Sequence, residues 1–243
     1  MNALSNGVPS ASIIAKFTAE NGFFAIPSRY YFKEQYLQQL LQLQQAFYKL
    51  EEDPYGGSRW RSRASFTFSR GKITHDPPSP YIQDKDDNYQ EKGRPRYFEQ
   101  VSDLVLDMPL FQELLNADLE IAKATGEVDF EEDLEIGIHM VRYAPRAGET
   151  SDSSPRWLHK DTEPVVFIHL VNLSGNALGG ENIISHDAKF SKDYTMVRLS
   201  EPLDTLLLNR LHFHAVVPLM VGFGEVAYRD VLLITFDKKK RYS

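Results

Sequence analysis

Seven short apolar or alternating runs in the second half constrain the fold more than any other feature of these 243 residues. Glycine, proline, asparagine and aspartate separate the runs, which cover residues 134–143, 163–173, 181–185, 195–199, 205–208, 214–218 and 229–237. Short runs at such regular spacing are typical of strands in a β-sandwich or β-barrel. The second half of the chain therefore predicts a jelly-roll core.

Helical patterns precede these strands. Apolar residues recur every three or four positions over residues 33–52, and a second helical pattern covers 109–125. A short helix over 11–20 and a short strand over 23–26 are also expected. We predict a mainly β fold of the α+β class, in which N-terminal helices buttress the jelly-roll core.

Two further segments belong to the first half. Residues 58–70 alternate as in a strand, with aromatic residues on one parity and Arg59, Arg61 and Arg63 on the other. Residues 75–93 are rich in proline, aspartate and asparagine and predict a long loop. Loops of this length often cover an active site or are mobile.

We expect a single domain over residues 1–243, because no linker or internal repeat divides the chain and β-sandwiches often reach this size. Residues 1–12 form a flexible lead in this prediction. Residues 13–130 form the helical buttress with the early strands, and residues 131–243 form the jelly-roll core.

Composition excludes several classes of function. The chain has no cysteine, which excludes disulfides, iron–sulfur clusters, thiolate zinc sites and cysteine nucleophiles, and agrees with a reducing, cytoplasmic location. A net charge of −7 argues against broad, sequence-independent nucleic-acid binding. No apolar run approaches the ~20 residues of a membrane span, and the first twelve residues lack the pattern of a signal peptide.

His159 and Asp161 form the first half of a candidate metal site. Side chains two residues apart in an extended segment share one face, and these two directly precede an apolar run. A third ligand from a distant strand would complete the arrangement of two histidines and one carboxylate that is diagnostic of non-heme Fe(II) oxygenases.

The third ligand is ambiguous by spacing, because His212 and His214 are also two residues apart. His214 begins an apolar run, whereas His212 follows a predicted turn, so we favour His214. The pair also permits a cupin-like metal site that uses both histidines with another metal and no 2-oxoglutarate.

Arg229 opens the last apolar strand, where an arginine is costly unless it pairs with an anion. Its planar guanidinium matches a carboxylate through two parallel hydrogen bonds. The partner could be Asp230 or another acidic residue of the chain. It could equally be the distal carboxylate of 2-oxoglutarate, bound to the metal through its keto-acid end.

The chain resembles the bacterial Fe(II)/2-oxoglutarate-dependent dioxygenases of free L-amino acids, the family of the L-isoleucine 4-hydroxylases. The similarity runs from about residue 14 to the final strand. It includes the following segments: Leu50-Glu51-Glu52-Asp53, His139-x-Val141-Arg142-Tyr143, Trp157-Leu158-His159-Lys160-Asp161, Glu163-Pro164-Val165-Val166-Phe167, Gly179-Gly180, Phe213-His214-Ala215-Val216 and Arg229-Asp230.

This resemblance implies a double-stranded β-helix core and three iron ligands, His159, Asp161 and His214, because the family has no histidine at the position of His212. It also implies that Arg229 anchors 2-oxoglutarate, with Tyr143 as a second contact. The implied reaction converts 2-oxoglutarate and O₂ to succinate and CO₂ and hydroxylates an unactivated C–H of an aliphatic L-amino acid such as isoleucine, leucine or methionine. No catalytic residue beyond the metal ligands is expected.

A free amino acid needs a cation for its carboxylate, acceptors for its ammonium and an apolar wall. The candidate cations are Arg59, Arg61, Arg63 and Arg142, of which we favour Arg61 and Arg142; the first three could instead coat an exposed sheet face. The candidate acceptors are Glu163, Asp152 and the acidic residues 84–87. The candidate wall is Trp60, Phe66, Trp157 and Phe167, of which we favour Trp157, although aromatic residues at this spacing are more often core.

Besides the cupin-like enzyme, a non-catalytic jelly-roll binding module stays open, in which His159 and Asp161 are incidental. In every case the expected partner is a small molecule, with no nucleic acid and no membrane, and a homodimer stays open.

Overall fold

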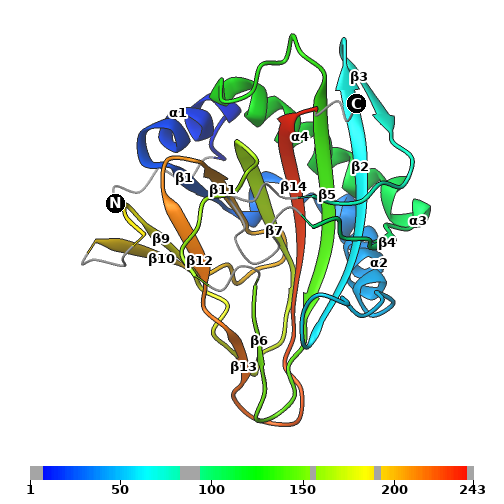
Figure 1. Cartoon of the computed structure of the whole chain (residues 1–243), viewed down its shortest axis with the longest axis vertical. Coiled ribbons are helices and arrows are strands. Elements are labelled where there is room, and N and C mark those ends of the chain that lie inside the picture. The colour runs from blue at the N-terminus through cyan, green and yellow to red at the C-terminus, as the bar shows by residue number, and fades with distance from the viewer. Residues whose placement is uncertain (1–7, 83–93, 154–156, 189–192, 240–243) are drawn as a thin grey trace.

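The computed structural model describes residues 8–82, 94–153, 157–188 and 193–239, and an eight-stranded sheet forms its centre (Figure 1). The strand order is β1-β11-β7-β14-β5-β2-β3, and β4 adds to β2. All pairs are antiparallel except β2–β4. The strands are β1 (Phe23–Ile26), β2 (Arg59–Ser69), β3 (Lys72–His75), β4 (Glu99–Gln100), β5 (Leu134–Tyr143), β7 (Val165–Leu173), β11 (Thr205–Asn209) and β14 (Arg229–Lys238).

Two small antiparallel sheets accompany the large one. One has the order β10-β9-β12 and the other β6-β13-β8. Their strands are β6 (Thr150–Ser151), β8 (Ala177–Leu178), β9 (Asn182–Ser185), β10 (Tyr194–Val197), β12 (Phe213–Val216) and β13 (Leu219–Val221).

The helices come from the first half of the chain and gather on one face of the large sheet (Figure 1). They are α1 (Ala11–Asn21), the 3₁₀ turns η1 (Ser28–Tyr30) and η2 (Glu34–Tyr36), α2 (Leu37–Phe47), α3 (Asp103–Leu106) and α4 (Pro109–Thr125). The predicted mainly β fold with N-terminal helices is confirmed. Among the described residues, no helix has both the length and the apolar character needed to cross a membrane.

Most long periodic segments lie where the sequence predicts them. Helix α4 and strand β5 have the predicted bounds. The helix expected over 33–52 instead begins as the turn η2 and ends at Phe47. It ends early because Glu52 forms a β-bridge with Trp60, which requires an extended backbone. The strands of two or three residues were not predicted, because so few residues carry no periodic pattern.

Alternation of side chains gives the large sheet two different faces. On the central strand β14, Leu232, Ile234 and Phe236 pack into the core shared with the helices. The alternate residues of that strand, from Arg229 to Thr235, point to the opposite side. The same separation holds along β5, β7 and β2, so that one face forms the main core and the other lines a cavity.

The arginines of β2 correct one sequence expectation. Arg59, Arg61 and Arg63 could have coated an exposed face, but Arg59 is 3% exposed and Arg63 is 5% exposed. Arg59 pairs with Asp53 at 2.6 Å and Arg63 with Glu135 at 2.6 Å. The polar parity of β2 is therefore buried as well, since it faces the cavity and not solvent.

The predicted aromatic wall lies mainly on the other face. Phe66 and Phe167 belong to the helix-side core, and Trp60 faces the same side because it is paired in register with Arg142. Phe66 and Phe167 stabilise this core, and none of the three residues lines the cavity.

A buried polar network joins the helices to the sheet. Asp118 of α4 accepts hydrogen bonds from the Tyr31 hydroxyl and from His169 Nε2, both at 2.7 Å. His169 Nδ1 lies 2.7 Å from the hydroxyl of Thr205 on the neighbouring strand β11. All four side chains are at most 1% exposed. Burial, and then Asp118, raise the pKa of Tyr31 well above its ordinary value, so the phenol stays protonated and donates.

We predict that Asp118→Ala lowers the free energy of unfolding by about 3–5 kcal/mol, because it leaves the buried Tyr31 and His169 donors without their acceptor. Thr205→Val removes a single hydroxyl from the same network and should cost about 1–2 kcal/mol. Urea unfolding of both variants measures the two losses. An Asp118→Ala protein at least as stable as Thr205→Val would show that the network does not hold α4 to the sheet.

Candidate metal centre and substrate cavity

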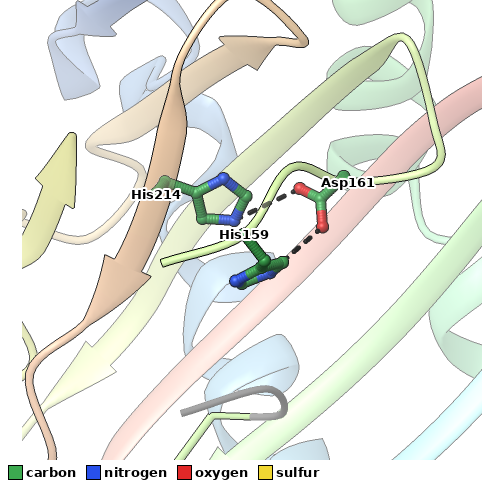
Figure 2. A group of neighbouring side chains, drawn as sticks. All are labelled: His159, Asp161 and His214. Carbon is green, nitrogen blue, oxygen red and sulfur yellow. Dashed lines mark ion pairs between the residues drawn. The ribbon is translucent and has the colours of Figure 1, made fainter. Parts of the chain in front are cut away.

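His159, Asp161 and His214 converge (Figure 2), and all three line the cavity. His159 Nε2 lies 3.5 Å from Asp161 Oδ1, and His214 Nε2 lies 3.3 Å from Asp161 Oδ2. One ligand atom from each residue lies within 4.8 Å of the others. Two imidazole nitrogens and one carboxylate oxygen on one side of a metal leave its other positions open.

Backbone pairing explains why residues fifty-five positions apart meet here. The amide of His159 donates to the carbonyl of His214 at 2.9 Å, and the amide of His214 donates back at 2.7 Å. His214 lies on β12, while His159 and Asp161 lie in the segment that leads into β7. The extended backbone places both on one side, as their spacing predicts.

A hydrogen bond orients the ring of His159. Its Nδ1 lies 2.9 Å from the carbonyl oxygen of Trp157, which can only accept, so Nδ1 carries the proton. The lone pair is then on Nε2, the nitrogen that faces Asp161. Backbone acceptors fix metal-binding histidines in this way.

The local charges favour cation binding. Burial opposes the charge of Asp161, but His214 and His159 outweigh it and hold the pKa of this carboxyl at about 2. Burial lowers the pKa of His214 to about 4, although Asp161 opposes the shift. Near neutral pH Asp161 is therefore an anion and His214 a neutral imidazole, which are the forms of these side chains that can bind a metal.

His212 does not lie with this group. Its ring makes an edge-to-face contact with His186, with ring centroids 4.1 Å apart. The structure thus brings His214, and not His212, to Asp161.

The cavity extends from this centre across the large sheet. Its volume is about 110 Å³. Its apolar lining consists of Val141, Val166, Ile168, Val216, Val231 and Leu233. Its polar lining includes Arg59, Arg61, Arg229, Tyr143, Asn182 and Glu163. A cavity in which apolar side chains lie beside convergent polar groups is typical of a small-molecule site.

Arg229 points into the cavity without an acidic partner among the described residues. It is 4% exposed, and its buried Nη2 has no hydrogen-bond partner there. Gly180 makes room for it, because a Cβ at that position would lie 3.0 Å from Arg229 Cδ. The ring of Tyr143, its partner in register on β5, is centred 6.0 Å from the guanidinium. This environment suits an anionic ligand.

Asp230 is not the partner of Arg229. Its carboxylate accepts from Arg142 Nη1 at 3.3 Å on the helix side of the sheet. The guanidinium of Arg142 also stacks 3.8 Å from the ring centre of Tyr48. The structure therefore does not bring Arg142 to the cavity. Trp157 is 40% exposed and its side chain does not line the cavity either.

Arg61 does reach the cavity. Its guanidinium lies 4.4 Å from the ring centre of Phe98, and Nη2 donates to His139 Nδ1 at 2.9 Å. Its buried Nε has no partner among the described residues, and no ion pair with a described carboxylate is present. Burial lowers the pKa of Arg61 to about 10, so it stays cationic at neutral pH.

Glu163 lines the same cavity, and its Oε1 accepts from the hydroxyl of Tyr81 at 3.1 Å. Burial and the neighbouring Asp161 raise its pKa to about 7. Of the other predicted acceptors, Asp152 is absent from the lining and residues 84–87 lie outside the described residues, as does most of the predicted 75–93 loop.

Six polar residues of the lining were not predicted as site residues from the sequence: Tyr81, Arg96, His139, Ser153, Asn182 and Thr235. His139 shares the parity of Val141 and Tyr143 on β5, and this signal could have identified it. Tyr81 and Arg96 pair in an isolated bridge within irregular chain, where no period is available.

Comparison with known proteins agrees with this geometry. The family model described as 2OG-Fe dioxygenase matches residues 44–235. The L-isoleucine-4-hydroxylase of Bacillus thuringiensis is 40% identical over 222 residues, covering 90% of this chain and 92% of that protein. The 3(1)-hydroxy-L-isoleucine 4-dioxygenase of Pantoea ananatis (strain AJ13355) is 36% identical over 241 residues, covering 93% and 96%. A crystal structure of IDO from Bacillus thuringiensis matches with a TM-score of 0.85 and 34% identity, covering 98% of this chain and 100% of that one.

We predict that His139 makes stability depend on pH. Burial, and then the charges of Arg61, Arg63 and Arg96, hold its pKa well below the ordinary value. The folded protein keeps it neutral, whereas the unfolded chain protonates it below about pH 6.5. Its contribution to stability is therefore fully present above about pH 6.5 and is lost as the pH falls. Below that pH, the free energy of unfolding decreases by about 1.4 kcal/mol for each pH unit.

His139→Asn keeps an acceptor for Arg61 but does not titrate. Urea unfolding with chelator at pH 7, 6 and 5 should show a smaller loss of stability for this variant than for the wild type. His186→Asn, at an exposed histidine, is the control and should retain the wild-type slope. Equal slopes for His139→Asn and wild type would contradict the assignment.

Proposed function

The chain belongs to the 2OG-Fe dioxygenase family, and from this premise we propose that it hydroxylates an unactivated C–H of a free aliphatic L-amino acid, with L-isoleucine as the first candidate. Membership makes the chain an Fe(II)- and 2-oxoglutarate-dependent dioxygenase with a double-stranded β-helix core. The substrate and the roles of individual residues are the proposed part.

His159, Asp161 and His214 are the proposed iron ligands. Their donor set suits Fe(II), their ligand atoms converge, and the ring of His159 already presents Nε2. When bound, iron and 2-oxoglutarate supply the oxidising chemistry, which converts 2-oxoglutarate and O₂ to succinate and CO₂.

Arg229 is the proposed anchor for the distal carboxylate of 2-oxoglutarate, with Tyr143 beside it. The supporting observation is a buried guanidinium that faces the cavity and has a buried nitrogen without a partner among the described residues. Arg229 would hold the cosubstrate by two parallel hydrogen bonds, while the surrounding chain excludes water from the reacting end.

Arg61 is the proposed contact for the substrate carboxylate. Valine, isoleucine and leucine residues of β5, β7 and β14 line the cavity and would contact an aliphatic side chain. The chain's contribution is then to hold the carboxylate fixed, so that one C–H of the side chain faces the metal. Both curated relatives carry isoleucine in their names, which supports this substrate class.

The observation that carries the proposal is that Arg61 and Arg229 lie in one cavity with the His159–Asp161–His214 triad, and that each has a buried guanidinium nitrogen without a hydrogen-bond partner among the described residues. Neither has an acidic partner among the described residues, so two separate anions can bind. A cupin-like site would need His212, which lies beside His186 instead. A cytoplasmic location, a homodimer and a single domain over 1–243 stay predictions.

We expect L-isoleucine, L-leucine or L-methionine to stimulate succinate release from 2-oxoglutarate in the presence of Fe(II) and ascorbate. Succinate is measured with each of the twenty L-amino acids and with none. Turnover that no amino acid raises above the background would disprove the substrate class. Asp161→Ala should lose the stimulated turnover; if it kept full activity, the metal assignment would be wrong.

We also expect His214→Ala to lose Fe(II) affinity by 100-fold or more, because one of three ligands is removed, whereas His212→Ala stays within about 3-fold of wild type. Anaerobic calorimetry measures the Fe(II) affinity of both variants. His186→Ala is the matched control, because His186 contacts the ring of His212. Loss of metal by His212→Ala would support the cupin-like arrangement instead.

A further inference from the structure

We propose that Glu163, held by Tyr81, binds the α-ammonium group of the substrate, and that this contact restricts the enzyme to amino acids over carboxylic acids with the same side chain. The inference rests on the proposed function, since it concerns the same cavity. It identifies a group that recognises the amine. The proposed metal ligands and the cationic Arg61 and Arg229 cannot take this role.

Glu163 lies in the cavity close to Asp161. It follows Asp161 by two residues, in the bend that leads into β7, and both side chains line the cavity. They are the two acidic residues of that lining. Asp161 already faces two histidines, so Glu163 is the carboxylate that can meet a substrate.

Among the described residues, Glu163 lacks a cationic partner. Two carboxylates on or beside β2 and β5 have an arginine partner: Asp53 pairs with Arg59, and Glu135 pairs with Arg63. Within 8–82, 94–153, 157–188 and 193–239, by contrast, no lysine, arginine or histidine forms an ion pair with Glu163. A carboxylate removed from water gains most from a charged hydrogen-bond donor, and a primary ammonium offers three N–H groups.

Tyr81 lies beside both Glu163 and Arg61. Its hydroxyl donates to Glu163 Oε1 at 3.1 Å, and its ring is centred 5.5 Å from the guanidinium of Arg61. One tyrosine therefore lies between the cation and the anion. It leaves the second carboxylate oxygen of Glu163 for a ligand.

These contacts match the charges of a zwitterion. The carboxylate of an amino acid would face Arg61 and its ammonium would face Glu163, with both groups on one side of the apolar lining. A ligand without the amino group would leave Glu163 without a cationic partner, and this mismatch disfavours it. The expected discrimination is about 10- to 100-fold in affinity, the usual effect of one charged hydrogen bond.

The test compares L-isoleucine with 3-methylpentanoate, which has the same carbon skeleton but no amino group. Calorimetry is performed without oxygen on the enzyme loaded with Fe(II) and 2-oxoglutarate. Wild type should bind L-isoleucine at least 10-fold more tightly. Glu163→Gln should lower the affinity for L-isoleucine by about 10- to 100-fold and change the affinity for 3-methylpentanoate by less than 3-fold. The preference for the amino acid would then be lost.

Two variants and one spectrum make this result specific. Tyr81→Phe removes the hydroxyl that donates to Glu163. It should lower the affinity for L-isoleucine less than Glu163→Gln does. Asp152→Asn, at the other acidic candidate, should leave both affinities unchanged. The visible absorption of the Fe(II)–2-oxoglutarate complex should form in Glu163→Gln at the wild-type cosubstrate concentration, because Asp161 is untouched.

Three results for Glu163→Gln would contradict this role: an equal loss of affinity for both ligands, an unchanged affinity for L-isoleucine, or loss of the visible absorption. Glu163 would then only shape the cavity or act through Asp161. Failure of the proposed function looks different, because wild type itself would then bind no amino acid and release no additional succinate. If another amino acid gives turnover, the comparison is made with that amino acid and its counterpart lacking the amino group.

Discussion

Side-chain alternation along the large sheet is the constraint on which the rest of this molecule depends. On β14, every second residue packs against the helices, and the residues between them line the cavity. A shift of one residue in the register of this strand would bury Arg229 in the helix-side core and turn Phe236 toward the cavity. The long ladders of β14 with β5 and β7 therefore fix the site as well as the fold.

The triad depends on a much smaller contact. Two backbone hydrogen bonds between His159 and His214 hold the segment before β7 against β12. This pairing brings both imidazoles to Asp161, whose low pKa reflects their proximity. The large sheet supplies Arg61 and Arg229, the proposed anion-binding groups, and the smaller β9–β10–β12 sheet contributes His214. The cavity lies between the two.

Periodicity determined how much of this could be predicted from the sequence. Helix α4 and strand β5 repeat over ten or more residues, and their bounds were predicted as observed. Parity within β5 places Arg142 on the same side as Ile138 and Met140, so the periodic pattern itself predicts that Arg142 lies away from the cavity. Tyr81 and Arg96 come from irregular chain, where sequence gives no direction for a side chain.

The cavity retains charges that the chain itself does not neutralise. Arg61 and Arg229 have no described acidic partner, and Glu163 has no described cation, although burial makes each of these charges unfavourable. The apolar helix-side core and the Asp118 network supply the stability that offsets this cost. These unmatched charges favour ligand binding. A dicarboxylate carries the charge opposite to that of Arg229, and a zwitterion carries the charges opposite to those of Arg61 and Glu163. The same charges should make the empty cavity poor at holding a neutral ligand of equal size.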